Sequence, residues 1–145
     1  MIAVDTNILI YAHRGESDFN VEAIQIIANL ANASTQWIVP LHCLVEFFAI
    51  VTHPKVYRPP SSIDDALEFL DDVIASPSVI IGGDAATTWS RLRLLLVDGA
   101  ISGPQAYDAR IAAVCLDHGV TELWSVDRGF SRFPHLKVVN PLAKS

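Results

Sequence analysis

The chain has 145 residues, of which 51% are hydrophobic, and a formal net charge of −6. The length predicts one globular domain over residues 1–145, and the hydrophobic content excludes a disordered chain. The acidic balance argues against a generic nucleic-acid binder, which would be basic. If four acids bind metal, however, 12 of the 16 acidic residues remain against 10 basic ones, so the charge weakens such a role without excluding it.

The cellular compartment is predicted from what the chain lacks. The amino-terminal segment has no basic stretch, apolar stretch and small-residue cleavage site in the order of a signal peptide. No uncharged apolar run approaches the roughly 18 residues that span a bilayer. Cys43 and Cys115 lie in apolar runs and form no CxxC pair, which predicts reduced core thiols. We therefore expect a cytoplasmic protein with no membrane partner.

Hydrophobic periodicity predicts the order of the elements. Short apolar runs are typical of strands buried on both faces of a parallel sheet, and apolar residues at helical spacing between stop signals predict helices. In chain order we expect a strand at 2–4, a helix capped by Asp5 or Thr6, a helix at 21–33, a strand at 37–39, a helix at 41–51, a helix from the Ser62–Asp65 capping box to Ser76, a strand at 79–81, a helix from Asp84 to Gly99, a helix at 106–118, and strands at 123–126 and 137–139.

This alternation of short apolar strands and helices predicts an α/β domain with a mostly parallel central sheet flanked by helices. Asp84 is predicted to cap its helix. Trp89 is predicted to lie on that helix's apolar face, and Trp89 and Trp124 to belong to the core rather than to a base-stacking platform. The five histidines show no ligand spacing and are predicted to be surface or structural residues.

Four acidic residues stand in otherwise apolar stretches: Asp5, Glu46, Asp108 and Asp127. Asp5 and Asp127 each follow a predicted strand. In a parallel sheet the carboxyl ends share one edge, where ligands bind, and neighbouring strands are about 4.8 Å apart. Asp108 lies in the first turn of its helix and Glu46 in the middle of another. Two such charges 4 Å apart repel by about 4 kcal/mol at an effective dielectric of 20, so a pocket that gathers them must bind cations or hold protons.

An all-oxygen set of ligands favours Mg²⁺ or Mn²⁺ over Zn²⁺. A hard ion held by carboxylates commonly serves phosphoryl chemistry, in which it activates a water and stabilises the leaving oxygen. The structural alternative remains open, because an acid after a strand is usually a helix cap. Glu46 could likewise form a structural ion pair with Arg110.

Each of the four acids lies in a short motif, and two tail segments follow the last one. The motifs are Val4-Asp5-Thr6-Asn7-Ile8-Leu9-Ile10-Tyr11, Leu44-Val45-Glu46-Phe47, Tyr107-Asp108-Ala109-Arg110-Ile111-Ala112-Ala113 and Ser125-Val126-Asp127-Arg128-Gly129-Phe130, followed by the tail segments Phe133-Pro134 and Asn140-Pro141-Leu142. In this order they resemble the motifs of the PIN-domain nucleases, and the similarity runs from residue 2 to about 142. Size and the segment His53-Pro54-Lys55-Val56-Tyr57 resemble most closely the VapC toxins of type II toxin–antitoxin pairs.

The resemblance implies a PIN-like three-layer α/β sandwich and a Mg²⁺- or Mn²⁺-dependent endoribonuclease. It also implies a homodimer and inhibition by a cognate VapB-like antitoxin. By the same resemblance Asp5 and Asp108 are the metal ligands, and Glu46 and Asp127 complete the acidic quartet through water or a second ion. The remaining expected roles are Thr6 or Asn7 orienting Asp5, Ser125 orienting Asp127, and Arg110, Arg128 or Arg132 contacting the phosphates of the RNA substrate.

The chain departs from the family pattern at two positions. Gly129 stands where many relatives carry a further acid, which argues for one tightly bound ion. Ser125 stands where threonine is common, which is a mild change. Two alternatives to the toxin remain: a nuclease of the same fold that acts on DNA or in RNA processing, and a non-catalytic module whose acidic pocket docks a basic partner peptide.

Overall fold

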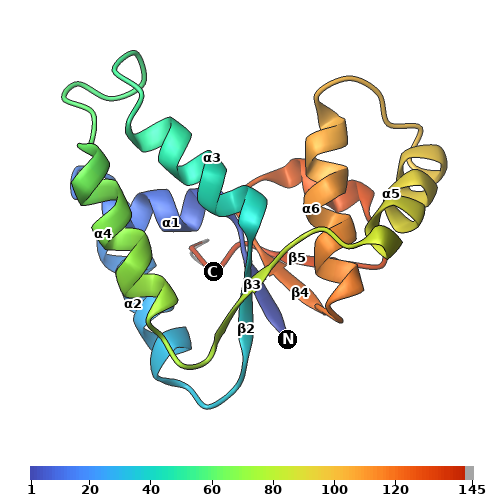
Figure 1. Ribbon diagram of the computed structural model, residues 1–145, viewed down its shortest axis with the longest axis horizontal. Helices are drawn as coiled ribbons and strands as arrows, with labels where there is room; N and C mark the ends of the chain where they lie inside the picture. Colours follow the sequence, from blue (N-terminus) through green and yellow to red (C-terminus); the bar gives the residue numbers. More distant parts are fainter. Residues whose placement is uncertain (143–145) are drawn as a thin grey trace.

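The computed structural model describes residues 1–142 (Figure 1). Within them, five strands form one sheet in the order β3-β2-β1-β4-β5, and every neighbouring pair is parallel. The mostly parallel sheet predicted from the sequence is therefore confirmed. The strands are β1 (Ile2–Val4), β2 (Trp37–Pro40), β3 (Val79–Gly82), β4 (Glu122–Trp124) and β5 (Lys137–Val139).

Helices cover both faces of this sheet. In Figure 1 the first four helices lie on one side of the strands and the last two on the other, so the molecule has three layers. This arrangement confirms the predicted three-layer sandwich. The helices are α1 (Thr6–His13), α2 (Asn20–Asn32), α3 (Leu41–Val51), α4 (Ile63–Ile74), α5 (Ala86–Asp98) and α6 (Gln105–Asp117), with a 3₁₀ helix η1 (Arg128–Arg132) after β4.

The strand order places a topological switch point at β1. The chain moves outward from β1 through β2 to β3, and then returns across the sheet to β4 on the other side of β1. The connections diverge at this point, and α/β proteins commonly bind ligands outside the carboxyl ends of the strands that flank such a point, here β1 and β4. Val4 pairs with Trp124, and the Asp5 amide continues the ladder by donating to the Trp124 carbonyl at 3.0 Å.

The core explains why such short strands are stable. Trp37, Ile38 and Leu123 are at most 1% exposed because helices cover both faces of the sheet. Gly82 ends β3 in a crowded position, since a Cβ there would lie 2.5 Å from Ile38 Cδ1 and 3.3 Å from Val114 Cγ1. Cys43 and Cys115 are free and buried, as the sequence predicts.

The predicted helices agree with the structure to within one or two residues, but three details were wrong. β4 ends at Trp124, two residues before the predicted end, because a turn follows in which the Ser125 hydroxyl accepts from the Asp127 amide. Asp84 does not cap α5: the cap residue is Ala85, whose amide donates to the Thr88 hydroxyl at 2.9 Å. Trp89 is 62% exposed and lies outside the core. Among the helices of residues 1–142, none has both the length and the apolar content needed to cross a membrane.

Candidate functional site

Asp5 lies at the carboxyl end of β1, and its carboxylate accepts more hydrogen bonds than those of the other three acids. It follows β1, caps α1 and is 4% exposed. Its Oδ1 accepts from the Thr6 amide at 2.8 Å, and its Oδ2 accepts from the Ser125 hydroxyl at 2.6 Å. Burial raises the pKa of Asp5 and the nearby Glu46 charge adds to the rise, while these hydrogen bonds oppose it. The carboxylate is thus oriented before any ligand arrives.

The residues expected to orient the acids have partly different roles. Thr6 holds Asp5 through its backbone amide, and its own hydroxyl is buried with no partner among residues 1–142. Asn7 Oδ1 instead lies 3.5 Å from the Val126 amide and so supports the turn after β4. Ser125 was expected to orient the Asp127 carboxylate, but its hydroxyl donates to Asp5 and accepts from the Asp127 amide at 2.9 Å. One serine therefore links the ends of β1 and β4.

Asp108 and Asp127 approach each other around Gly129. Asp127 is exposed, and its Oδ1 accepts from the Gly129 amide at 2.8 Å. A Cβ on Gly129 would lie 3.1 Å from Asp127 Oδ1 and 3.4 Å from Asp108 Oδ2. Burial raises the pKa of Asp108, and the charges of Asp127, Asp5 and Glu46 raise it further. The fold therefore brings all four predicted acids into one electrostatic neighbourhood.

Glu46 projects from α3 toward the same neighbourhood, and its side chain is 41% exposed. The ion pair with Arg110 that the sequence left open is not formed. Arg110 instead binds Asp84 at 2.6 Å, and Glu46 Oε2 lies 3.7 Å from Nε2 of His42, four residues earlier on α3. Sequence reasoning missed both His42 and Asp84. The spacing of four between His42 and Glu46 was the available signal, because it places two side chains on one helix face.

The three arginines predicted to contact phosphate differ in their surroundings. Arg110 is engaged by Asp84. Arg132 donates to Gln105 at the start of α6. Arg128 is exposed next to Asp127 and lines a cavity of about 390 Å³ with Ser125, Asp127 and others. Among the three, Arg128 is thus the best placed for a phosphate next to the acids.

The four acids offer only oxygen donors, which suit Mg²⁺ or Mn²⁺. Within residues 1–142, no three His, Cys, Asp or Glu side chains already surround a point that would hold an ion. Like charges repel, so the carboxylates approach one another more closely only with a cation or proton between them. The carboxylate oxygens and the gathering of negative charge therefore fit a divalent ion. The side chains must rotate toward one another to bind it.

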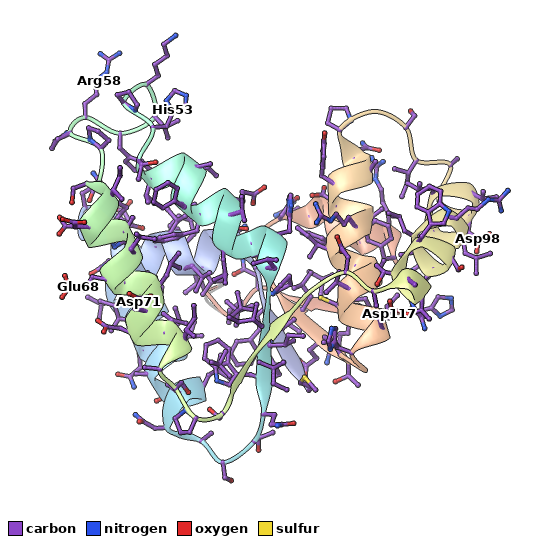
Figure 2. The ribbon with its side chains drawn as sticks, viewed as in Figure 1. His53, Arg58, Glu68, Asp71, Asp98 and Asp117 are labelled. Carbon is purple, nitrogen blue, oxygen red and sulfur yellow. The ribbon has the colours of Figure 1, made fainter. Side chains whose placement is uncertain are left out.

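The mutual repulsion predicts that Asp108→Asn stabilises the metal-free protein at about pH 7. Folding raises the pKa of Asp108, so the protonated Asp108 side chain adds to the free energy of unfolding. This contribution is fully present below the unfolded-state pKa and is lost as pH rises through the folded-state pKa. Melting temperatures measured in EDTA should therefore be higher for the variant near neutrality, and the difference should vanish at low pH. Asp98→Asn, at the exposed end of α5 (Figure 2), is the control and should change little. A lower melting temperature for Asp108→Asn near neutrality would contradict this account.

The family model of the PIN domain matches residues 2–136. This chain therefore belongs to the PIN-domain family, as its motifs suggested. Its relatives include Ribonuclease VapC43 of Mycobacterium tuberculosis, 33% identical over 142 residues that cover 98% of this chain and 96% of that one. Ribonuclease VapC25 of the same organism is 27% identical over 141 residues, which cover 97% and 99% of the two chains.

Solved structures show the same fold. VapC20 of Mycobacterium tuberculosis, described as a sarcin–ricin loop cleaving toxin, matches with a TM-score of 0.66 and 18% identity, covering 90% of this chain and 93% of its own. VapBC2 of Rickettsia felis, bound to a promoter DNA fragment, matches with a TM-score of 0.63 and 19% identity, covering 96% and 98%.

Proposed function

We propose that this protein is a Mg²⁺- or Mn²⁺-dependent endoribonuclease and the toxin of a type II toxin–antitoxin pair. The observation that supports the proposal is that Asp5 and Asp127 follow the adjacent strands β1 and β4, with Asp108 and Glu46 near enough for the charges to interact. Four carboxylates in one neighbourhood are costly without a cation. Near full-length similarity to VapC ribonucleases supports RNA as the substrate.

Asp5 and Asp108 would hold the ion, with Glu46 and Asp127 completing the set. The bound ion supplies an activated water and stabilises charge on the leaving oxygen. The protein's own contribution is orientation. Ser125 and Thr6 fix both oxygens of Asp5, and Arg128, beside Asp127, would contact a backbone phosphate. Gly129 leaves space between Asp108 and Asp127 rather than a further ligand.

The partners belong to the same proposal. Several structures of similar fold are toxin–antitoxin complexes, including VapBC of Salmonella typhimurium bound to DNA. We therefore expect a VapB-like antitoxin to bind and inhibit this chain. We also expect the chain to form a homodimer and to act in the cytoplasm. A nuclease of the same fold with another nucleic-acid substrate and a non-catalytic binding module are the alternatives.

The test is cleavage of total cellular RNA by purified protein with Mg²⁺, with Mn²⁺ and with EDTA. Discrete fragments that appear only with metal are expected. The same reactions with single- and double-stranded DNA separate the DNA nuclease, which would cut those substrates instead. Absence of any cleavage by folded protein would overturn the proposal and favour the binding module. Growth arrest on expression, relieved by a co-expressed antitoxin, tests the toxin role separately.

A further inference from the structure

A chain of polar contacts links Asp84 to Glu46. Asp84, between β3 and α5, accepts from Arg110 Nη2 at 2.6 Å and from Nε at 3.1 Å. Arg110 Nη1 lies 3.4 Å from His42 Nδ1. The opposite nitrogen of His42, Nε2, lies 3.7 Å from Glu46 Oε2. Asp84, Arg110 and His42, from three parts of the chain, are therefore in successive contact with Glu46.

The order of these contacts determines which nitrogen of His42 carries a proton. A guanidinium has only donors, so the Nδ1 atom that faces Arg110 must act as the acceptor. A neutral His42 then carries its hydrogen on Nε2, the edge directed at Glu46. At 3.7 Å this contact is longer than a hydrogen bond, but its polarity attracts the carboxylate to that edge.

The ring of His42 is also held from the side. It stacks on Tyr107 with a centroid separation of 6.2 Å and an interplanar angle of 5°. Tyr107 immediately precedes Asp108 on α6, and His42 and Glu46 share one face of α3. The stack therefore spans the two helices that carry two of the four acids, and it fixes the plane in which the His42 nitrogens point.

We propose that His42 is a positioning residue: held as the Nε2–H tautomer by the Asp84–Arg110 pair, it orients the Glu46 carboxylate toward Asp5 and Asp108. The tautomer follows from geometry alone, whereas the effect on cleavage rests on the proposed function. The role also accounts for Arg110, whose engagement by Asp84 makes it a support for His42 rather than a free phosphate ligand.

The tautomer is measured first, on metal-free protein, by long-range proton–nitrogen NMR of the neutral imidazole. We expect a protonated Nε2 and an unprotonated, hydrogen-bonded Nδ1. In Arg110→Met the Nδ1 resonance should lose its hydrogen-bond shift. The matched control is Arg91→Met, because Arg91 also pairs with an aspartate at 2.6 Å, Asp117, at the far end of α6 from Asp108 (Figure 2). A protonated Nδ1, or the same response in both variants, would overturn the tautomer.

Kinetics then separate positioning from packing. His42→Phe keeps a ring to stack on Tyr107 but removes both nitrogens, whereas His42→Gln keeps an amide donor near the position of Nε2. We expect His42→Phe to lower kcat by about 10- to 100-fold, as loss of a ligand's supporting partner does, with KM little changed, and His42→Gln to recover most of it. Full activity of His42→Phe, or a glutamine as impaired as the phenylalanine, would overturn the positioning role.

The NMR measurement and the cleavage kinetics test separate claims, so either claim can be wrong without the other. If the wild-type protein cleaved no RNA, the proposed function would fall, while the NMR result would still decide the arrangement of Asp84, Arg110 and His42. If cleavage occurred but His42→Phe retained full kcat, the function would stand and the inference about His42 would be wrong.

Discussion

Asp5→Asn is expected to lower metal-dependent RNA cleavage by at least about 100-fold, because loss of a supporting partner alone costs 10- to 100-fold and Asp5 would contact the ion directly. The fold should survive. The asparagine oxygen can still accept from the Thr6 amide, and its amide group can donate to the Ser125 hydroxyl, so the link between β1 and β4 is kept. The substitution removes the charge and reverses the direction of the hydrogen bond with Ser125.

The measurement is the initial rate of cleavage of one mapped RNA substrate, with circular dichroism to confirm folding. Asp71→Asn is the matched control, since it makes the same change on the exposed face of α4 (Figure 2) and should keep the wild-type rate. A folded Asp5→Asn protein with wild-type activity would remove Asp5 from the mechanism and return it to the role of a helix cap.

Phe47→Ala is expected to lower the free energy of unfolding by about 3–5 kcal/mol, the usual cost of emptying a phenylalanine site in a core. Phe47 is 0% exposed. Its ring packs on Phe69 at 5.2 Å and on His13 at 5.3 Å between centroids, so the cavity would open where α1, α3 and α4 meet. Since domains of this size are stable by only about 5–15 kcal/mol, the variant should be close to unfolding.

Urea unfolding followed by fluorescence measures this change. Phe19→Ala is the control, because Phe19 is 41% exposed and its main aromatic contact is a tilted ring pair with Tyr11 at 5.5 Å. It should cost no more than about 0.5–1.5 kcal/mol. Equal losses for Phe47→Ala and Phe19→Ala would show that the α1–α3–α4 contact is not the stabilising core that the buried rings indicate.

The predictions of position that the structure confirms concern residues that a local pattern places. Asp5 and Asp127 follow apolar strands, and parallel strands bring their carboxyl ends to one edge whatever the rest of the chain does. The cap formed by Ser62, whose hydroxyl accepts from the Asp65 amide at 3.0 Å, depends on a spacing of three residues and was predicted for the same reason.

The predictions that failed concern residues whose partner lies on another element. Asp84 looked like a cap because it precedes a helix, but its carboxylate accepts hydrogen bonds from Arg110, 26 residues later. Trp89 looked like a core residue because it stands at helical spacing from Leu92 and Leu96 on α5, yet the packing of α5 on α6 leaves it exposed. Periodicity identifies an apolar face but not how much of that face a neighbouring helix will cover.

The fold class and the positions of Asp5 and Asp127 after two strands could thus be predicted from the order of residues, because strand alternation acts over a few positions. The contact of His42 with Arg110 joins residues 68 positions apart, and the link from Ser125 to Asp5 joins residues 120 apart. Neither contact follows from a local pattern, because each depends on which helices and strands become neighbours when the helices pack on the sheet. The acids could be found one by one along the chain; the geometry that orients them arises only when β1, β4, α3 and α6 pack together.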